Sequence, residues 1–177
     1  MEYVGQQSIR KICNFYVSDV HLSVMLIPYI SREINKDVEI TTIFEKLERQ
    51  NVEGILEKLN IRNKEQILNI NWFNGNKDTY EKINNLIEED LKKHKKVTII
   101  IGGCEEYILK NNKKVMQMLN AKESYFNKIE PDGDNYEVKI INCYNIEEVG
   151  NRAKYIVRKY DGLMNTSGEV PTSAIAL

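Results

Sequence analysis

The sequence predicts an α/β protein with a single doubly wound, mostly parallel five-stranded sheet and helices on both faces. Short runs of apolar and β-branched residues alternate five times with longer segments whose apolar residues recur at helical spacing. Parallel strands require long crossover connections, and helices of this length usually form them. No repeat, low-complexity tract or linker rich in glycine and proline divides the 177 residues, so we expect one domain.

The first strand is expected at residues 11–17 (KICNFYV), and Ser18 and Asp19 follow it as candidate N-caps of a helix. One side of this helix is defined by the spacing of Leu22, Leu26, Tyr29, Ile30 and Ile34. Pro28 falls within the helix and should bend it, because the proline ring prevents one backbone hydrogen bond.

The next two strands are marked by β-branched and aromatic residues. Residues 38–44 (VEITTIF) predict the second strand, and residues 45–60 predict the helix after it. The third strand is expected at residues 67–73 (ILNINWF). A turn then leads to Asp78, whose spacing to Glu81 fits a capping box at the start of the third helix.

The stretch VTIIIGGCEEY, from Val97 to Tyr107, predicts the fourth strand, and its nearly continuous apolar run indicates burial on both faces. A helix should follow through Leu119, and then a long polar connection at residues 122–135. The fifth strand is expected at residues 136–144 and the fifth helix at residues 146–160. We assign residues 8–164 to the α/β domain and expect residues 165–177 to form a flexible tail.

The composition excludes several classes of protein. The 25 basic and 26 acidic residues are mixed along the chain, which argues against direct nucleic-acid binding and against an anionic membrane surface as partner. No apolar stretch is long enough to span a bilayer, and no signal-peptide pattern opens the sequence. The three cysteines form no CxxC pair. We therefore expect a cytoplasmic protein with reduced thiols.

Ligands of doubly wound sheets bind beyond the carboxyl ends of the strands. The candidate ligand-binding residues at those ends are Tyr16, Asp19, His21, Phe44, Glu45, Trp72, Asn74, Gly102, Gly103, Cys104, Glu105 and Tyr144.

The double glycine raises the question of a phosphate site, because helices that start after glycine-rich turns often bind phosphate. A P-loop also needs a lysine followed by a hydroxyl residue, whereas Gly102 and Gly103 are followed by Cys104, Glu105 and Glu106. The two carboxylates would repel a triphosphate. We interpret the glycines as a tight turn, and we expect no nucleotide cofactor and no metal site.

Cys104 is also a candidate nucleophile, since a helix N-terminus favours the thiolate. The neighbouring Glu105 and Glu106 oppose it, and neither histidine is placed by sequence as its base. His21 is better explained by helix capping and His94 by the protein surface. We favour a cysteine that fills a core turn and expect no catalytic residues.

Trp72, the single tryptophan, ends a predicted strand at the ligand edge, near Phe73 and within possible reach of Tyr16, Phe44 and Tyr144. An aromatic wall with few charges suits an apolar or planar ligand. Rings that only close the top of the core are an equally good interpretation.

The order of these segments resembles the MEDS domain, a sensory domain of methanogens and methylotrophs with a RecA/KaiC-like α/β scaffold. The resemblance covers about residues 8–164 and is carried by the segments FYVSDVHLSVMLIPYISREI, WFNGNKDTYEKINNLIEEDL, VTIIIGGCEEYIL and IINCYNIEEVGNRAKYIVRKYDGLM. The basic, glycine-flanked segment that usually precedes the second strand is replaced here by SREINKDVEI.

This resemblance implies a small domain that senses small, often hydrocarbon-like molecules and takes part in signal transduction or transcriptional control. Its partner would be a regulatory protein or a second copy of the chain. Two alternatives remain at this point: a thiol-dependent or nucleotide-utilising enzyme with Cys104, Glu105 and His21 as its site, and an oligomerising interaction module.

Overall fold

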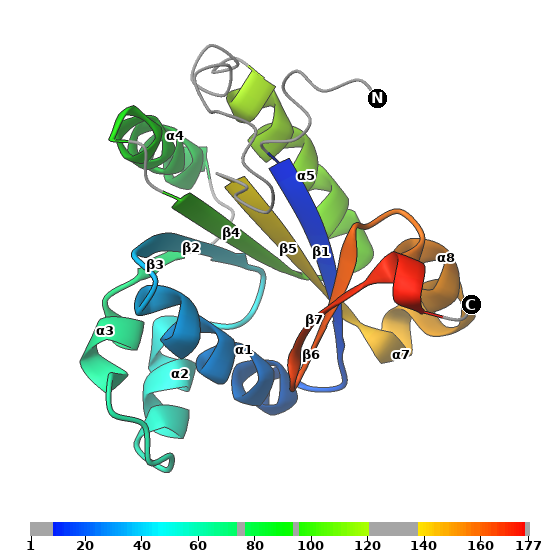
Figure 1. The fold of residues 1–177 in the computed structure, drawn as a ribbon, viewed down its shortest axis with the longest axis horizontal. Helices are drawn as coiled ribbons and strands as arrows, with labels where there is room; N and C mark the ends of the chain where they lie inside the picture. Colours follow the sequence, from blue (N-terminus) through cyan, green and yellow to red (C-terminus); the bar gives the residue numbers. More distant parts are fainter. Residues whose placement is uncertain (1–8, 74–76, 94–95, 121–137, 176–177) are drawn as a thin grey trace.

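The computed structural model describes residues 9–73, 77–93, 96–120 and 138–175. It confirms the mixed α/β class with a mostly parallel sheet (Figure 1). The sheet has seven strands in the order β3-β2-β4-β5-β1-β6-β7, rather than the five expected. The two additional strands lie at the C-terminal end of the chain. Asn74, His94 and the expected connection at residues 122–135 lie outside the described residues.

Six strands are parallel and the last is antiparallel to its neighbour. The strands are β1 (Ile9–Tyr16), β2 (Val38–Phe44), β3 (Asn71–Phe73), β4 (Lys96–Gly103), β5 (Val138–Asn145), β6 (Gly162–Asn165) and β7 (Gly168–Pro171).

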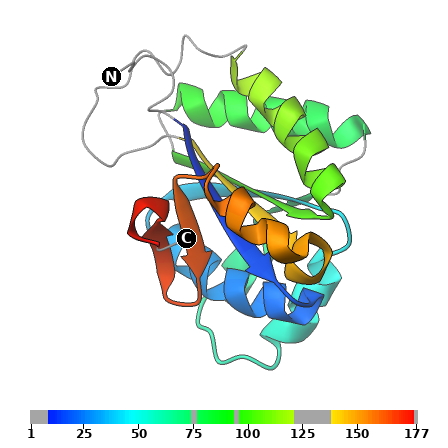
Figure 2. The same cartoon turned by 90° about the vertical axis from the view of Figure 1, so that its right-hand side faces the viewer.

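Helices cover both faces of the sheet, as Figures 1 and 2 show. Helices α1 (Asp19–Ile34), α2 (Arg49–Leu56) and α3 (Lys64–Leu68) pack on one face. The opposite face carries α4 (Lys77–Lys92), α5 (Glu105–Asn120), α7 (Ile146–Val149) and α8 (Ala153–Val157). We call these the α1 face and the α5 face.

Side chains that alternate along β4 pack in the cores on both faces of the sheet. Ile99 and Ile101 pack in the core of the α5 face, and Ile100 packs in the core of the α1 face. All three are fully buried. Successive strand residues point to opposite faces, so burial on both sides requires a continuous apolar sequence.

The prediction of a long third strand was wrong. Residues 64–68 form the short helix α3 and only Asn71–Phe73 form β3. Ile67 is fully buried from within α3, in the core of the α1 face. A short apolar run of this kind has no periodicity that separates a strand from a buried turn of helix.

The fifth helix is also interrupted. Gly150 adopts a φ of 52° after α7, and a 3₁₀ turn, η1 (Gly150–Arg152), separates α7 from α8. A positive φ is easily adopted by glycine and ends regular helix. The α5 face is therefore covered near β1 and β5 by short helical pieces.

The expected tail from residue 165 onward is instead a β-hairpin followed by a 3₁₀ turn, η2 (Thr172–Ala174). Gly168, with a φ of 128°, closes the turn between β6 and β7. Glu169 in β7 accepts from Lys139 Nζ at 2.6 Å and lies 3.5 Å from Arg10 Nη1. These ion pairs attach the hairpin to the sheet, a long-range contact that local sequence does not reveal.

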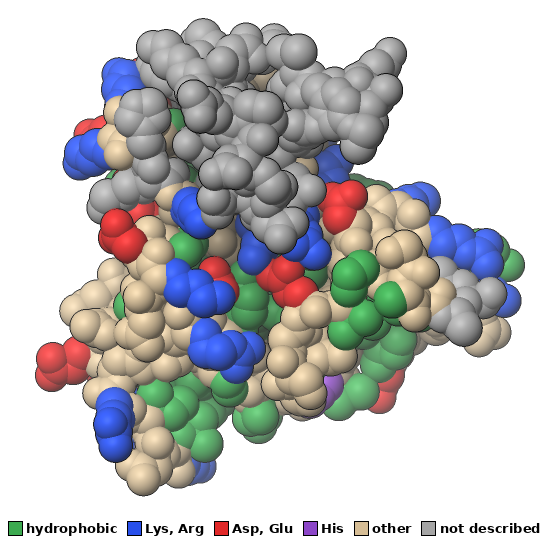
Figure 3. All heavy atoms as spheres, in the orientation of Figure 1, with side chains coloured by type: hydrophobic (Ala, Val, Ile, Leu, Met, Phe, Trp, Pro, Cys, Tyr) green, Lys and Arg blue, Asp and Glu red, His purple; other side chains and the backbone are tan. Residues whose placement is uncertain are grey.

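On the described part of the face shown in Figure 3, basic and acidic side chains are intermixed, in agreement with the mixed charge of the sequence. None of the described helices combines the length and the apolar character needed to cross a bilayer.

Candidate ligand site at the carboxyl ends of the strands

A hollow of about 260 Å³ lies where β1, β2, β4 and β5 end. We call it the strand-end hollow. Its lining comes from the last residues of these four strands and from the segments that follow them. The lining residues are Tyr16, Ser18, Asp19, Leu22, Phe44, Glu45, Lys46, Leu47, Gly102, Gly103, Cys104, Asn145 and Glu148.

Because Gly102 and Gly103 carry no side chain, neighbouring side chains can pack directly against the β4–α5 turn. A Cβ on Gly102 would lie 2.7 Å from the ring of Phe44. A Cβ on Gly103 would lie 2.8 Å from Glu45 Cβ and from the ring of Tyr107. Both distances are shorter than ordinary van der Waals contact. The glycines therefore allow β2 and α5 to approach the end of β4 closely.

Glu45 caps the helix that starts after these glycines. Its Oε2 accepts the backbone N–H of Cys104 at 2.7 Å, and its own N–H donates to the carbonyl of Gly102 at 3.0 Å. A carboxylate at a helix start is stabilised by the helix dipole. One of the amides at this helix start is thus already paired with an anion from the end of β2.

The other two helix starts at the hollow are capped by their own side chains. At the β1–α1 turn, Ser18 Oγ accepts the N–H of His21 at 3.1 Å, and His21 Nδ1 accepts the N–H of Val17 at 3.1 Å. At the β5–α7 turn, Asn145 Oδ1 accepts the N–H of Glu147 at 2.9 Å. Such caps satisfy N–H groups that an anion would otherwise use.

The charges in the hollow are mainly negative. Asp19, Glu45 and Glu148 contribute carboxylates, and Lys46 contributes the one cationic side chain among the residues that line it. Burial raises the pKa of the Tyr16 hydroxyl, and Cys143 and these three carboxylates raise it further. A hollow with this balance favours a cationic or donor-bearing group over a polyphosphate.

Cysteine, histidine and carboxylate side chains do not assemble into a metal site in the described part of the chain.

The three residues of the alternative thiol-enzyme site each contact a different group. Cys104 Sγ lies 3.7 Å from Glu45 Oε1 and accepts the N–H of Tyr107 at 3.4 Å. Glu105 pairs with Arg152, and His21 accepts the N–H of Val17.

The structure brings seven of the twelve candidate residues together at the hollow: Tyr16, Asp19, Phe44, Glu45, Gly102, Gly103 and Cys104. Lys46 and Glu148 also line it and were not among the candidates. They lie two residues after β2 and three residues after β5, so a wider window after each strand end would have included them.

Trp72 lies behind the hollow and does not line it. Its ring stacks on Phe44 with centroids 6.2 Å apart, and its indole N–H donates to the carbonyl of Ile67 at 3.2 Å. The ring of Phe44, which lines the hollow, therefore connects Trp72 to it.

Tyr144 lies on the other face of the sheet. In the β1–β5 register it pairs with Phe15, and its hydroxyl lies 2.5 Å from that of Tyr160. Tyr16, one residue further along β1 than Phe15, points to the α1 face. The expected aromatic wall is therefore divided between the two faces, because neighbouring strand residues point in opposite directions.

No protein-family model and no curated protein matches the chain. Among solved structures, a chain similar to this one is the ORC2 protein of Aeropyrum pernix in its ADPNP–ADP complexes, with 9% sequence identity and a TM-score of 0.34. The match covers 86% of this chain and 39% of that one, so this chain spans about two fifths of its length.

Proposed function

We propose that this protein is a cytoplasmic sensory or regulatory domain that binds a small ligand in the strand-end hollow, without a working phosphate loop. The observation that carries the proposal is the capping of all three helix starts at the hollow by Ser18, Glu45 and Asn145. An open hollow remains beside these caps. The resemblance to MEDS domains supports the same role, with a partner protein or a second copy as the recipient of the signal.

The lining favours a small amine with an apolar part. Leu22, Phe44 and Leu47 provide buried apolar surface, while Asp19 and Glu148 provide carboxylates. Apolar contact contributes about 25 cal/mol per Å² buried, and a charge-assisted hydrogen bond fixes the orientation. This mixed chemistry is compatible with the apolar or mixed ligand expected from the sequence.

The thiol-enzyme alternative has less support, because Cys104, Glu105 and His21 each contact a different group. A thiol-reactive probe distinguishes the two functions. We expect Cys104 to react no faster at neutral pH than free cysteine. A rate about tenfold or more above that of free cysteine would favour the enzyme.

Trp72 provides a direct assay for ligand binding because Phe44, on which it stacks, lines the hollow. We suggest titrating the protein with n-butylamine, n-butanol and n-butyrate while recording Trp72 emission and thermal stability. The amine should give a saturable change, and butyrate should give none. Asp19→Asn and Glu148→Gln should each weaken amine binding about tenfold, the loss of one charge-assisted interaction.

Glu147→Gln is the matched control, since Glu147 is exposed on the same short helix and does not line the hollow. Equal binding of amine and butyrate would refute the ligand class. The absence of any saturable response to all three compounds would count against binding at the strand-end hollow.

A further inference from the structure

A second cavity, of about 160 Å³, lies on the α5 face of the sheet. We call it the α5–α8 cavity, because its walls come from α5, from α8 and the residues just after it, and from β1 and β5. Leu109, Met116, Ile140 and Ile156 supply its apolar surface. Leu109 is 56% exposed, which places it at the mouth of the cavity. The short, interrupted α7–α8 segment leaves this space beside α5 open.

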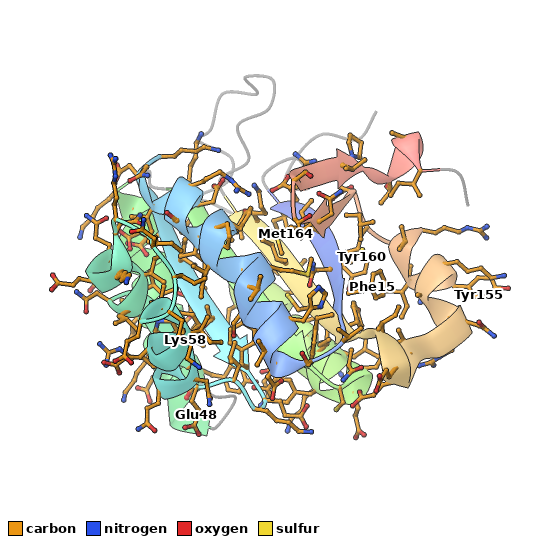
Figure 4. All side chains as sticks on the ribbon, turned by 90° about the horizontal axis from the view of Figure 1, so that it is seen from below. Phe15, Glu48, Lys58, Tyr155, Tyr160 and Met164 are labelled. Atoms are coloured by element: carbon orange, nitrogen blue, oxygen red, sulfur yellow. The ribbon has the colours of Figure 1, made fainter. Side chains whose placement is uncertain are left out.

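One part of this cavity is polar and buried. Asn142 Nδ2 donates to the hydroxyl of Tyr160 at 2.7 Å, and this hydroxyl lies 2.5 Å from that of Tyr144. Tyr160 is directed toward the sheet, whereas Tyr155 of α8 projects outward and is 53% exposed (Figure 4). Burial raises the pKa of Tyr160 and of Tyr144, so both hydroxyls remain protonated at neutral pH.

Two buried oxygens of the cavity residues have no hydrogen-bond partner among the described residues. They are Oδ1 of Asn142, a residue only 1% exposed, and Oδ1 of Asn112 on α5. An unpaired buried acceptor costs about 1–3 kcal/mol, so native proteins usually satisfy it. Both oxygens are acceptors on residues that line the cavity, and a small rotation of either amide would present its oxygen to a donor on a bound molecule.

We propose that the α5–α8 cavity is a second ligand site, distinct from the strand-end hollow, which binds a small ring-sized molecule carrying a hydroxyl or amino donor. The donor pairs with Asn142 Oδ1 or Asn112 Oδ1, and the ring packs on Met116, Ile140 and Ile156. The volume agrees with this size, since an engineered apolar cavity of about 150 Å³ binds benzene. The site is independent of the function proposed above, because none of its residues lines the strand-end hollow.

Phenol and toluene provide a matched pair of probes, since they have nearly the same shape and only phenol carries a donor. Ligand-observed NMR and calorimetry on the full chain should show saturable binding of phenol. Phenol should bind at least about tenfold more tightly than toluene, although toluene is the more apolar molecule.

Leu109→Trp should block the mouth and abolish phenol binding, and this exposed position should tolerate the change. Val24→Trp is the matched control, because Val24 is 44% exposed and lies on α1, across the sheet. Asn112→Leu should reduce the preference for phenol over toluene. Asp19→Asn, in the strand-end hollow, should leave phenol binding unchanged.

Three results would overturn the proposal: equal affinity for phenol and toluene, phenol binding that survives Leu109→Trp, or no phenol binding up to about 10 mM. The last result would mean that the cavity holds only water. Thermal melts of each variant establish that it is folded when the binding measurement is made.

Discussion

The carboxylate of Glu45, at the end of β2, accepts the backbone N–H of Cys104, at the start of α5, at 2.7 Å. This bond joins residues 59 positions apart and closes the turn after the double glycine. It gives the glycine-rich turn a structural role. The anion at this helix start belongs to the protein itself.

The first prediction concerns this cap. Replacing Glu45 by alanine should lower the free energy of unfolding by about 1 kcal/mol or more, the usual cost of losing a helix cap. Glu45→Gln should cost less, since the amide oxygen still accepts the bond. Urea unfolding measures both, with Glu53→Ala, an exposed glutamate in α2, as control. Equal effects of Glu45→Ala and Glu53→Ala would contradict the cap.

The second prediction concerns the first glycine. Gly102→Ala should destabilise the protein by about 1–3 kcal/mol, because the added Cβ would meet the ring of Phe44 in a closely packed core. Trp72 emission should also change, since Phe44 is stacked on it. Gly54→Ala in α2 is the control. Its Cβ would meet no atom within 4 Å, so it should stabilise the helix by about 0.5–1 kcal/mol.

The third prediction concerns alkaline pH. Burial raises the pKa of the Cys13 thiol from 9.0 to about 12, and burial also raises the pKa of Cys143. Above pH 9 the unfolded chain therefore loses thiol protons that the folded chain keeps. Well below pH 9 these two thiols should add no pH dependence to the free energy of unfolding. Between pH 9 and 12 they should make it fall as the pH rises.

Urea unfolding between neutral pH and pH 9 measures the onset of this slope, because the tyrosines of the unfolded chain, with a reference pKa of 10.0, are still mostly protonated there. Cys13→Ala should reduce the slope even if it lowers stability overall. An unchanged slope in this variant would show that Cys13 does not contribute.

The fourth prediction concerns the C-terminal hairpin. Glu169→Gln removes the negative charge that pairs with Lys139 and Arg10, and the hairpin should open more often. Hydrogen exchange of the β6 and β7 amides should become faster, while exchange in β4 should change little. A comparable increase in β4 would indicate global destabilisation instead of local release of the hairpin.

Local patterns in the sequence were enough to predict the α/β class and most of the strand-end residues. The run from Val97 to Gly102 identified a doubly buried strand, and strand ends in such a sheet meet at one edge. The secondary structure at Ile67 could not be predicted, because one apolar residue fits a strand or a helical turn equally well. The hairpin was missed because Glu169 is held by partners far away in sequence.

The candidate site was predicted less completely for a related reason. Tyr16 is the last residue of β1 and Tyr144 the last but one of β5, and the register between the two strands pairs Tyr144 with Phe15 and places it on the other face. Only the strand pairing reveals this difference. The cap from Glu45 to Cys104 likewise depends on β2 lying next to β4, which the order of segments along the chain does not specify.

The most direct test of the central claim follows the Cys104 amide in a ¹H–¹⁵N NMR spectrum during a titration with Mg·ATP. Because Glu45 already pairs with this amide, we expect its resonance to stay in place, as should those of Gly103 and His21. A saturable shift of the Cys104 amide on addition of Mg·ATP would show that phosphate replaces Glu45 at this helix start and would contradict the account.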